Sequence, residues 1–62
     1  MKHQITIWKT RAGWLAKFTD PQVRELFGTD TIPTAYTEHA GLDYVLPRIT
    51  QQNPDCDIIV KS

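Results

Sequence analysis

QITIWKTRAGWLAKFT, residues 4–19, is the stretch that decides the fold. Apolar and polar residues alternate with a period of two in residues 4–9 and again in residues 14–19, as they do in strands with one face against a core. Between them, residues 10–13, TRAG, supply a short turn that contains glycine. The stretch therefore predicts an antiparallel β-hairpin.

The hairpin assigns its side chains to two faces, because residues opposite one another in an antiparallel pair point the same way. A turn closed within residues 10–13 predicts a core face that carries Ile5, Ile7, Trp14, Ala16 and Phe18, with Lys9 on the same side. The other face then carries Gln4, Thr6, Trp8, Leu15 and Lys17. Trp8 is expected directly across from Leu15, so an apolar pair is predicted on a face that should meet water.

Residues 20–27 leave two alternatives open. Asp20-Pro21 is a turn signal, because proline fixes its own φ and shifts the preceding residue away from helical values. VRELF, residues 23–27, then fits a short third strand or a single helical turn, since its apolar residues do not alternate cleanly. We favour the third strand.

The segment AGLDYVLPRITQQ, residues 40–52, predicts a helix, because its apolar residues recur at i, i+3, i+4 and i+7. These residues are Leu42, Val45, Leu46 and Ile49. Pro47 is accommodated if the helix begins near Leu42 or Asp43, since the first four N–H groups of a helix have no partner within it.

The sequence also predicts the ends of this helix and the last strand. Asp43 or Thr37 is expected to cap the start of the helix, and Asn53-Pro54 to end it. CDIIV, residues 56–60, places apolar side chains at alternate positions and predicts a closing strand.

These elements predict a single domain over residues 1–62, of the two-layer α+β class, in the order β-β-(β)-α-β. One helix packs on a small, mainly antiparallel sheet that is led by the N-terminal hairpin. A chain of this length buries only about 60% of the surface that it exposes when unfolded, which allows one core. The uncovered face of the sheet is expected to carry Trp8, Leu15 and Ile59.

Residues with catalytic or ligand-binding chemistry form no recognisable motif. Cys56 with His39 or His3 has the atoms of a nucleophile and a base, but Cys56 falls in an apolar strand pattern, where cysteine usually behaves as a small buried hydrophobe. The histidines, aspartates and cysteine also lack compact metal-ligand spacing. We therefore expect no catalytic, metal or cofactor site, and a protein that is not an enzyme.

FGTDTIPTAYT, residues 27–37, is interpreted as a connector between elements. It lacks the lysine and the glycine density of a phosphate-binding loop, whereas Asp30 and the threonines are suited to hydrogen bonds with nearby backbone. Eleven residues is long for such a connection, so Tyr36 is the first residue in it to which we would assign a function.

Cysteine usage and hydropathy indicate a cytoplasmic protein. Cys56 is the only cysteine, which excludes an intramolecular disulfide and fits a reducing compartment. The N-terminus lacks the apolar core of a signal peptide, and no run approaches the roughly 20 apolar residues of a membrane span. We expect no association with a membrane.

The net charge is zero, but residues 1–19 carry +4 and the remainder −4. Protein interaction, as a homo-oligomer or with a small protein partner, is the favoured function, and the predicted interface is Trp8, Leu15, Lys17 and Tyr36. The alternative is a weak nucleic-acid-binding domain, in which phosphates and a base are contacted by Lys9, Arg11, Lys17 and Trp8.

GWLAKFTD, residues 13–20, followed by FGTDT, residues 27–31, resembles segments of HicB-type antitoxins, and the resemblance extends over roughly residues 4–50. It implies a curtailed double-stranded-RNA-binding-like fold with Gly13 at the hairpin turn and Asp20 after the second strand. Gly28, Asp30 and Thr31 would lead into the helix. The resemblance also implies a non-enzymatic protein that oligomerises and masks a small toxin ribonuclease.

Overall fold

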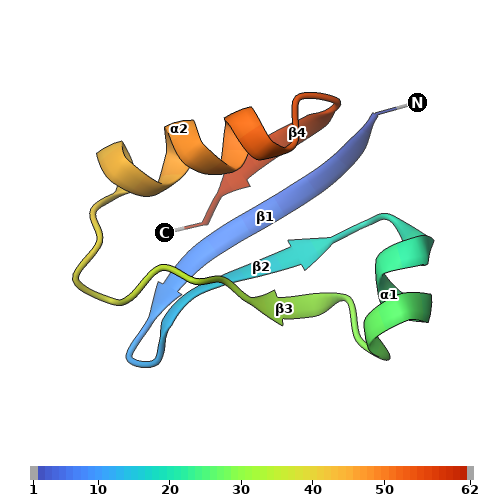
Figure 1. Ribbon diagram of the computed structural model, residues 1–62, viewed down its shortest axis with the longest axis horizontal. Coiled ribbons are helices and arrows are strands. Elements are labelled where there is room, and N and C mark those ends of the chain that lie inside the picture. Colours follow the sequence, from blue (N-terminus) through green and yellow to red (C-terminus); the bar gives the residue numbers. More distant parts are fainter. Residues whose placement is uncertain (1, 62) are drawn as a thin grey trace.

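The hairpin predicted from the alternation is present. In the computed structural model, which describes residues 2–61, β1 (His3–Thr10) pairs antiparallel with β2 (Gly13–Phe18) (Figure 1). Trp8 lies opposite Leu15, as expected. The Thr10 hydroxyl holds the turn, because it donates to the carbonyl of the first residue of β2 at 2.8 Å and accepts a backbone N–H within the turn at 3.1 Å.

Residues 23–27 are helical, so the third strand that we favoured there is wrong. They belong to α1 (Pro21–Phe27). Asp20 begins this helix because its carboxylate accepts a first-turn N–H at 2.9 Å, and Pro21 follows at a position where a helix needs no N–H. Gly28 ends α1 in the left-handed conformation, with φ 76°.

The third strand is β3 (Thr31–Pro33), which pairs antiparallel with β2. The segment 27–37 is therefore a connector with a strand inside it. The Asp30 carbonyl continues this pairing, since it accepts the Phe18 N–H at 2.8 Å. The resemblance implied that Gly28, Asp30 and Thr31 lead into a helix, but they lead into β3.

The predicted long helix and closing strand are confirmed as α2 (Leu42–Gln52), which ends at Asn53, and β4 (Cys56–Val60). β4 pairs parallel with β1, so the sheet has the order β3-β2-β1-β4. Among residues 2–61, two of the three strand pairings are antiparallel, and there are two helices where one was expected. The α+β class is confirmed.

The start of α2 differs from the expectation in two ways. Gly41 is the N-cap residue, and within the described chain neither Asp43 nor Thr37 makes a side-chain capping bond; Asp43 lies in the first turn, where its charge suits the helix dipole. Pro47 is the sixth helical residue and thus lies beyond the four N-terminal positions that need no partner. Its ring removes a helical hydrogen bond to the Asp43 carbonyl, on an exposed side of α2.

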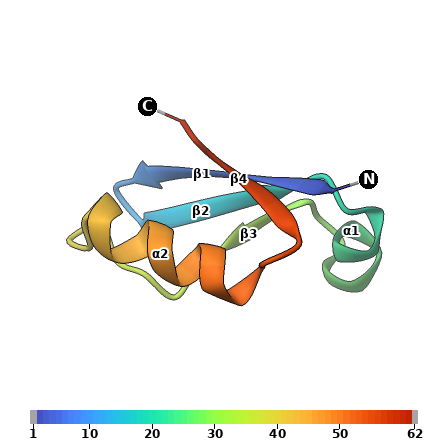
Figure 2. The same cartoon turned by 90° about the horizontal axis from the view of Figure 1, so that it is seen from above.

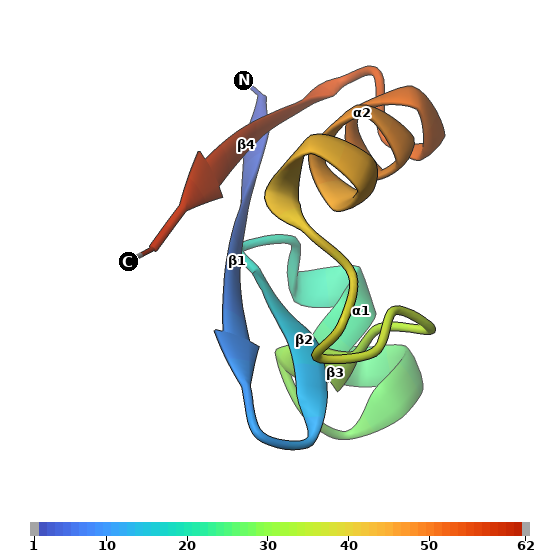
Figure 3. The same ribbon diagram turned by 90° about the vertical axis from the view of Figure 1, so that its left-hand side faces the viewer.

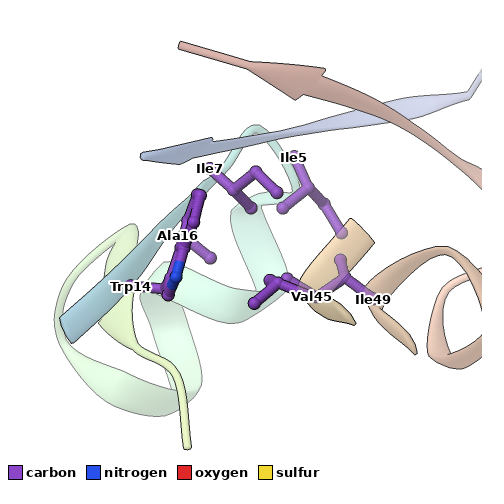
Figure 4. Close-up of a cluster of buried hydrophobic side chains, with 6 residues drawn as sticks. All are labelled: Ile5, Ile7, Trp14, Ala16, Val45 and Ile49. Carbon is purple, nitrogen blue, oxygen red and sulfur yellow. The ribbon is translucent and has the colours of Figure 1, made fainter. Parts of the chain in front are cut away.

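The core lies between the sheet and α2. Figure 4 shows the six buried side chains that compose it: Ile5, Ile7, Trp14, Ala16, Val45 and Ile49. The core face predicted for the hairpin is therefore confirmed, except that Phe18 is half-buried at its margin. Both helices lie on the same side of the sheet (Figures 2 and 3).

The segment that crosses from β3 to α2 is fastened to Trp14. The backbone N–H of Trp14 donates to the Tyr36 carbonyl at 3.1 Å, and the Trp14 carbonyl accepts the N–H and the hydroxyl of Thr34 at 3.0 and 2.7 Å. The buried indole N–H of Trp14 donates to the Ala40 carbonyl at 2.8 Å. One residue of β2 thus determines the path of the chain into α2.

Gly13 lies under this crossing segment, and its replacement is expected to be more damaging than that of Gly28. A Cβ on Gly13 would lie 2.8 Å from the Tyr36 carbonyl oxygen, at a φ of 114°, whereas a Cβ on Gly28 would meet nothing within 4 Å. We expect Gly28→Ala to lower the free energy of unfolding by about 1–2 kcal/mol, from the left-handed backbone alone. Gly13→Ala should cost about 3 kcal/mol.

Urea unfolding followed by circular dichroism measures both variants. Net stability for a chain of this length is on the order of 3–9 kcal/mol, so the Gly13→Ala variant should be partly unfolded at modest urea concentrations. An equal decrease in the free energy of unfolding for Gly13→Ala and Gly28→Ala would contradict the close approach of the crossing segment to the hairpin.

Candidate interaction surface

The side of the sheet opposite α2 carries the apolar pair predicted from the hairpin. Trp8 of β1 lies opposite Leu15 of β2, and Leu15 lies opposite Pro33 of β3, so the three side chains form one row on one face. In the neighbouring row, Ile59 of β4 is paired with Thr6 of β1. We call Trp8, Leu15, Pro33 and Ile59 the open-face patch.

The open-face patch is accessible to solvent, although Trp8 and Leu15 lie side by side and are each only partly exposed. Trp8 and Leu15 are half-buried, Pro33 is exposed, and Ile59 is 41% exposed. Figure 3 shows both helices on the other side of the sheet. The patch spans all four strands, and its members therefore keep fixed positions relative to one another.

Two cations flank the open-face patch. Lys17 lies beside Thr6 in the row next to Trp8 and is exposed. Lys61 continues β4, because its N–H donates to the Ile7 carbonyl at 2.9 Å, and its ammonium group lies 5.7 Å from the centre of the Trp8 ring. This distance is within the range of a cation–π contact.

The predicted interface is only partly assembled in the structure. Trp8, Leu15 and Lys17 share the open face, but Tyr36 lies on the helix side, where it packs against the core and meets Tyr44 edge-to-face at 6.0 Å. Tyr36 lines open hollows on that side of the molecule, one beside the start of α2 and one between α2 and β3. It belongs to a different surface from Trp8.

Two contributors were not in the predicted interface. Pro33 reaches the open face because β3 pairs with β2, and Lys61 because β4 pairs with β1. Both pairings join segments far apart in the sequence. The alternation of apolar residues in 56–60 was the one signal for this part of the patch, and it had already indicated Ile59.

The cations of the predicted nucleic-acid site do not share one face. Lys17 and Trp8 lie on the open face, whereas Lys9 is paired with Trp14 on the other face and Arg11 lies in the hairpin turn. Lys61, which was not in the predicted site, lies beside Trp8. The positive charge around Trp8 thus comes from β2 and from the residue that follows β4.

Of the residues considered for catalysis, His3 and Cys56 lie together, whereas His39 lies in a different segment. His3 and Cys56 are neighbours on β1 and β4, and His3 Nε2 lies 4.0 Å from a carboxylate oxygen of Asp20. His39 lies in the crossing segment, with its Nε2 3.8 Å from Glu38. Cys56 is half-buried against the core. Across residues 2–61, no three His, Cys, Asp or Glu side chains are grouped as a metal site requires.

The chain matches no protein-family model, no curated protein and no solved structure. None of the helices in the part of the chain that the structure describes has the length and apolar character to cross a membrane.

The two tryptophans should differ in their access to solvent. Trp14 is 6% exposed with its indole N–H bonded, whereas Trp8 is half-buried on the open face. In the Trp14→Phe variant we expect the remaining Trp8 to emit at longer wavelength and to be quenched strongly by acrylamide. In the Trp8→Phe variant the remaining Trp14 should be protected from quenching by acrylamide.

Circular dichroism of both variants serves as the control for folding. Equal quenching of the two tryptophans in folded variants would show that the assignment of faces is wrong.

Proposed function

We propose that this protein is a non-enzymatic interaction module that binds a protein partner through the open-face patch and associates with a second copy of itself through this face or through a sheet edge. One observation carries the proposal: Trp8, Leu15 and Pro33 form an apolar row on the side of the sheet opposite both helices. Tryptophan is enriched among the residues that dominate binding energy at protein interfaces. A row on a rigid sheet also loses little conformational freedom on binding.

The surroundings of the row fit the same function. Protein interfaces combine an apolar centre with a polar rim, and here Lys17 and Lys61 flank the apolar side chains. A partner with an apolar centre and acidic groups at its margin would complement this arrangement. The lone Cys56 fits the reducing cytoplasm as the place of interaction.

The resemblance to HicB-type antitoxins supplies a class of partner. It rests on GWLAKFTD, residues 13–20, and FGTDT, residues 27–31, and it supports a small toxin ribonuclease as the protein that is masked. The first of these segments contains Leu15 and Lys17, so the resemblance and the open-face patch concern the same strand.

Trp8→Glu should strongly weaken partner binding without unfolding the chain. Loss of a central tryptophan at an interface costs about 2 kcal/mol or more, which is roughly a thirtyfold loss of affinity. The matched control is Leu26→Glu, because Leu26 is 79% exposed on α1, away from the open face. Affinity capture from the native host, quantified by mass spectrometry, compares the wild type with both variants.

Capture of the same proteins by the wild type and by Trp8→Glu would contradict the proposal. Loss of capture in Leu26→Glu alone would move the binding surface to α1.

The nucleic-acid alternative is favoured only by Lys17 and Lys61 beside Trp8. Fluorescence anisotropy with short single-stranded RNA and DNA at two salt concentrations decides it, because affinity that depends on phosphate contacts falls as salt rises. On the protein-binding proposal we expect no binding at low salt. Salt-sensitive binding that Lys17→Ala weakens would support the alternative instead.

A further inference from the structure

β4 is an edge strand whose outer side is suited to pairing. β3, at the opposite edge, has three residues and includes Pro33, and a proline at a sheet edge opposes further pairing. β4 has five residues, CDIIV, without proline or glycine. Ile59 and Val60 on it are 41% and 40% exposed.

The backbone groups that β4 directs outward can be identified. The Lys61 N–H donates to β1, and the direction of backbone groups alternates along a strand. Asp57 and Ile59 therefore also direct their N–H and C=O groups toward β1. Ile58 and Val60 direct theirs away from the sheet.

We propose that two copies of this chain pair antiparallel through β4, about a two-fold axis at Ile59. Ile58 of one copy then lies opposite Val60 of the second copy, and these two residues exchange backbone hydrogen bonds. Ile59 faces Ile59 of the second copy. The two sheets become one continuous sheet, and the two open-face patches lie on the same side of it.

Charge selects this register. With Ile59 at the axis, Asp57 of each copy lies opposite Lys61 of the other, so two opposite-charge pairs form, one on each side of the axis. Moving the axis to Ile58 places Asp57 opposite Ile59, which leaves its carboxylate without a cation, and places Lys61 opposite Asp55, which lies in the turn before β4 and not in the strand. Opposite charges across strands stabilise a pairing and like charges oppose it.

This inference rests on the proposed function, since it names a second copy as one partner, but it depends on the β4 edge and not on Trp8. The two are therefore tested by different substitutions. If the β4 variants leave self-association unchanged, the edge pairing is wrong, and the effect of Trp8→Glu still decides the role of the open-face patch.

A charge exchange tests the register. Asp57→Lys and Lys61→Asp each turn both attractive pairs into repulsive ones, and we expect each to weaken the dimer by about tenfold or more at low ionic strength. The double variant restores opposite charges in the same positions and should bind within about threefold of wild type. Sedimentation over a range of concentrations measures the dimer, and circular dichroism verifies folding.

A disulfide tests the axis directly. In the proposed dimer, Ile59→Cys in a Cys56→Ala background places the new thiol opposite the same thiol of the second copy. The two residues form a non-hydrogen-bonded pair, in which the Cα atoms lie about 4.5 Å apart, so a disulfide can form. We expect a covalent dimer on mild oxidation. Thr6→Cys in the same background is the control, because Thr6 lies one strand inside and should give none.

Three results would overturn the proposal. They are a wild type that stays monomeric at all concentrations, a dimer that both single charge variants and the double variant leave equally strong, and covalent dimer in equal yield from Ile59→Cys and Thr6→Cys. A dimer that only Trp8→Glu disrupts would assign self-association to the open-face patch instead.

Discussion

The hydrogen bonds of Trp14 position the second layer of this fold. Its backbone and indole hold Thr34, Tyr36 and Ala40, so the segment from β3 to α2 follows the surface of the hairpin. This segment determines where α2 begins, and the start of α2 determines that Val45 and Ile49 meet the hairpin's isoleucines. A buried indole with its N–H bonded contributes apolar area without an unsatisfied donor. Both layers therefore depend on one residue of β2.

The features that the sequence predicts correctly are those set by neighbours in the chain. The alternation in residues 4–19 determines the hairpin and the pairing of Trp8 with Leu15, and the spacing in residues 40–52 determines α2. The helical signals around residues 23–27, Asp20-Pro21 before them and Gly28 after them, were present, but Asp20-Pro21 was interpreted only as a turn and a third strand was favoured. The position of Tyr36, the parallel pairing of β4 and the three residues of β3 depend on contacts between distant segments. A local pattern does not contain that information.

The open-face patch exists because the chain is too short to cover both sides of its sheet. With α2 as its longer helix, the chain covers one side of a four-stranded sheet. The hairpin nevertheless has large apolar residues on both faces, and only those toward α2 are buried. Trp8 and Leu15 shield one another in part, which limits the exposed apolar area of the free protein. A surface of this kind can be tolerated in the unbound state and still be available to a partner.

The parallel pairing of β4 with β1 also has a consequence for folding. Ile5 pairs with Ile58, so the ladder joins segments at opposite ends of the described chain. A hairpin closes within microseconds from local contacts, whereas pairing of distant segments must first close a long loop. During synthesis, β1 and β2 can meet long before β4 leaves the ribosome. Until then one side of β1 has unpaired backbone groups, and these groups can pair with other chains.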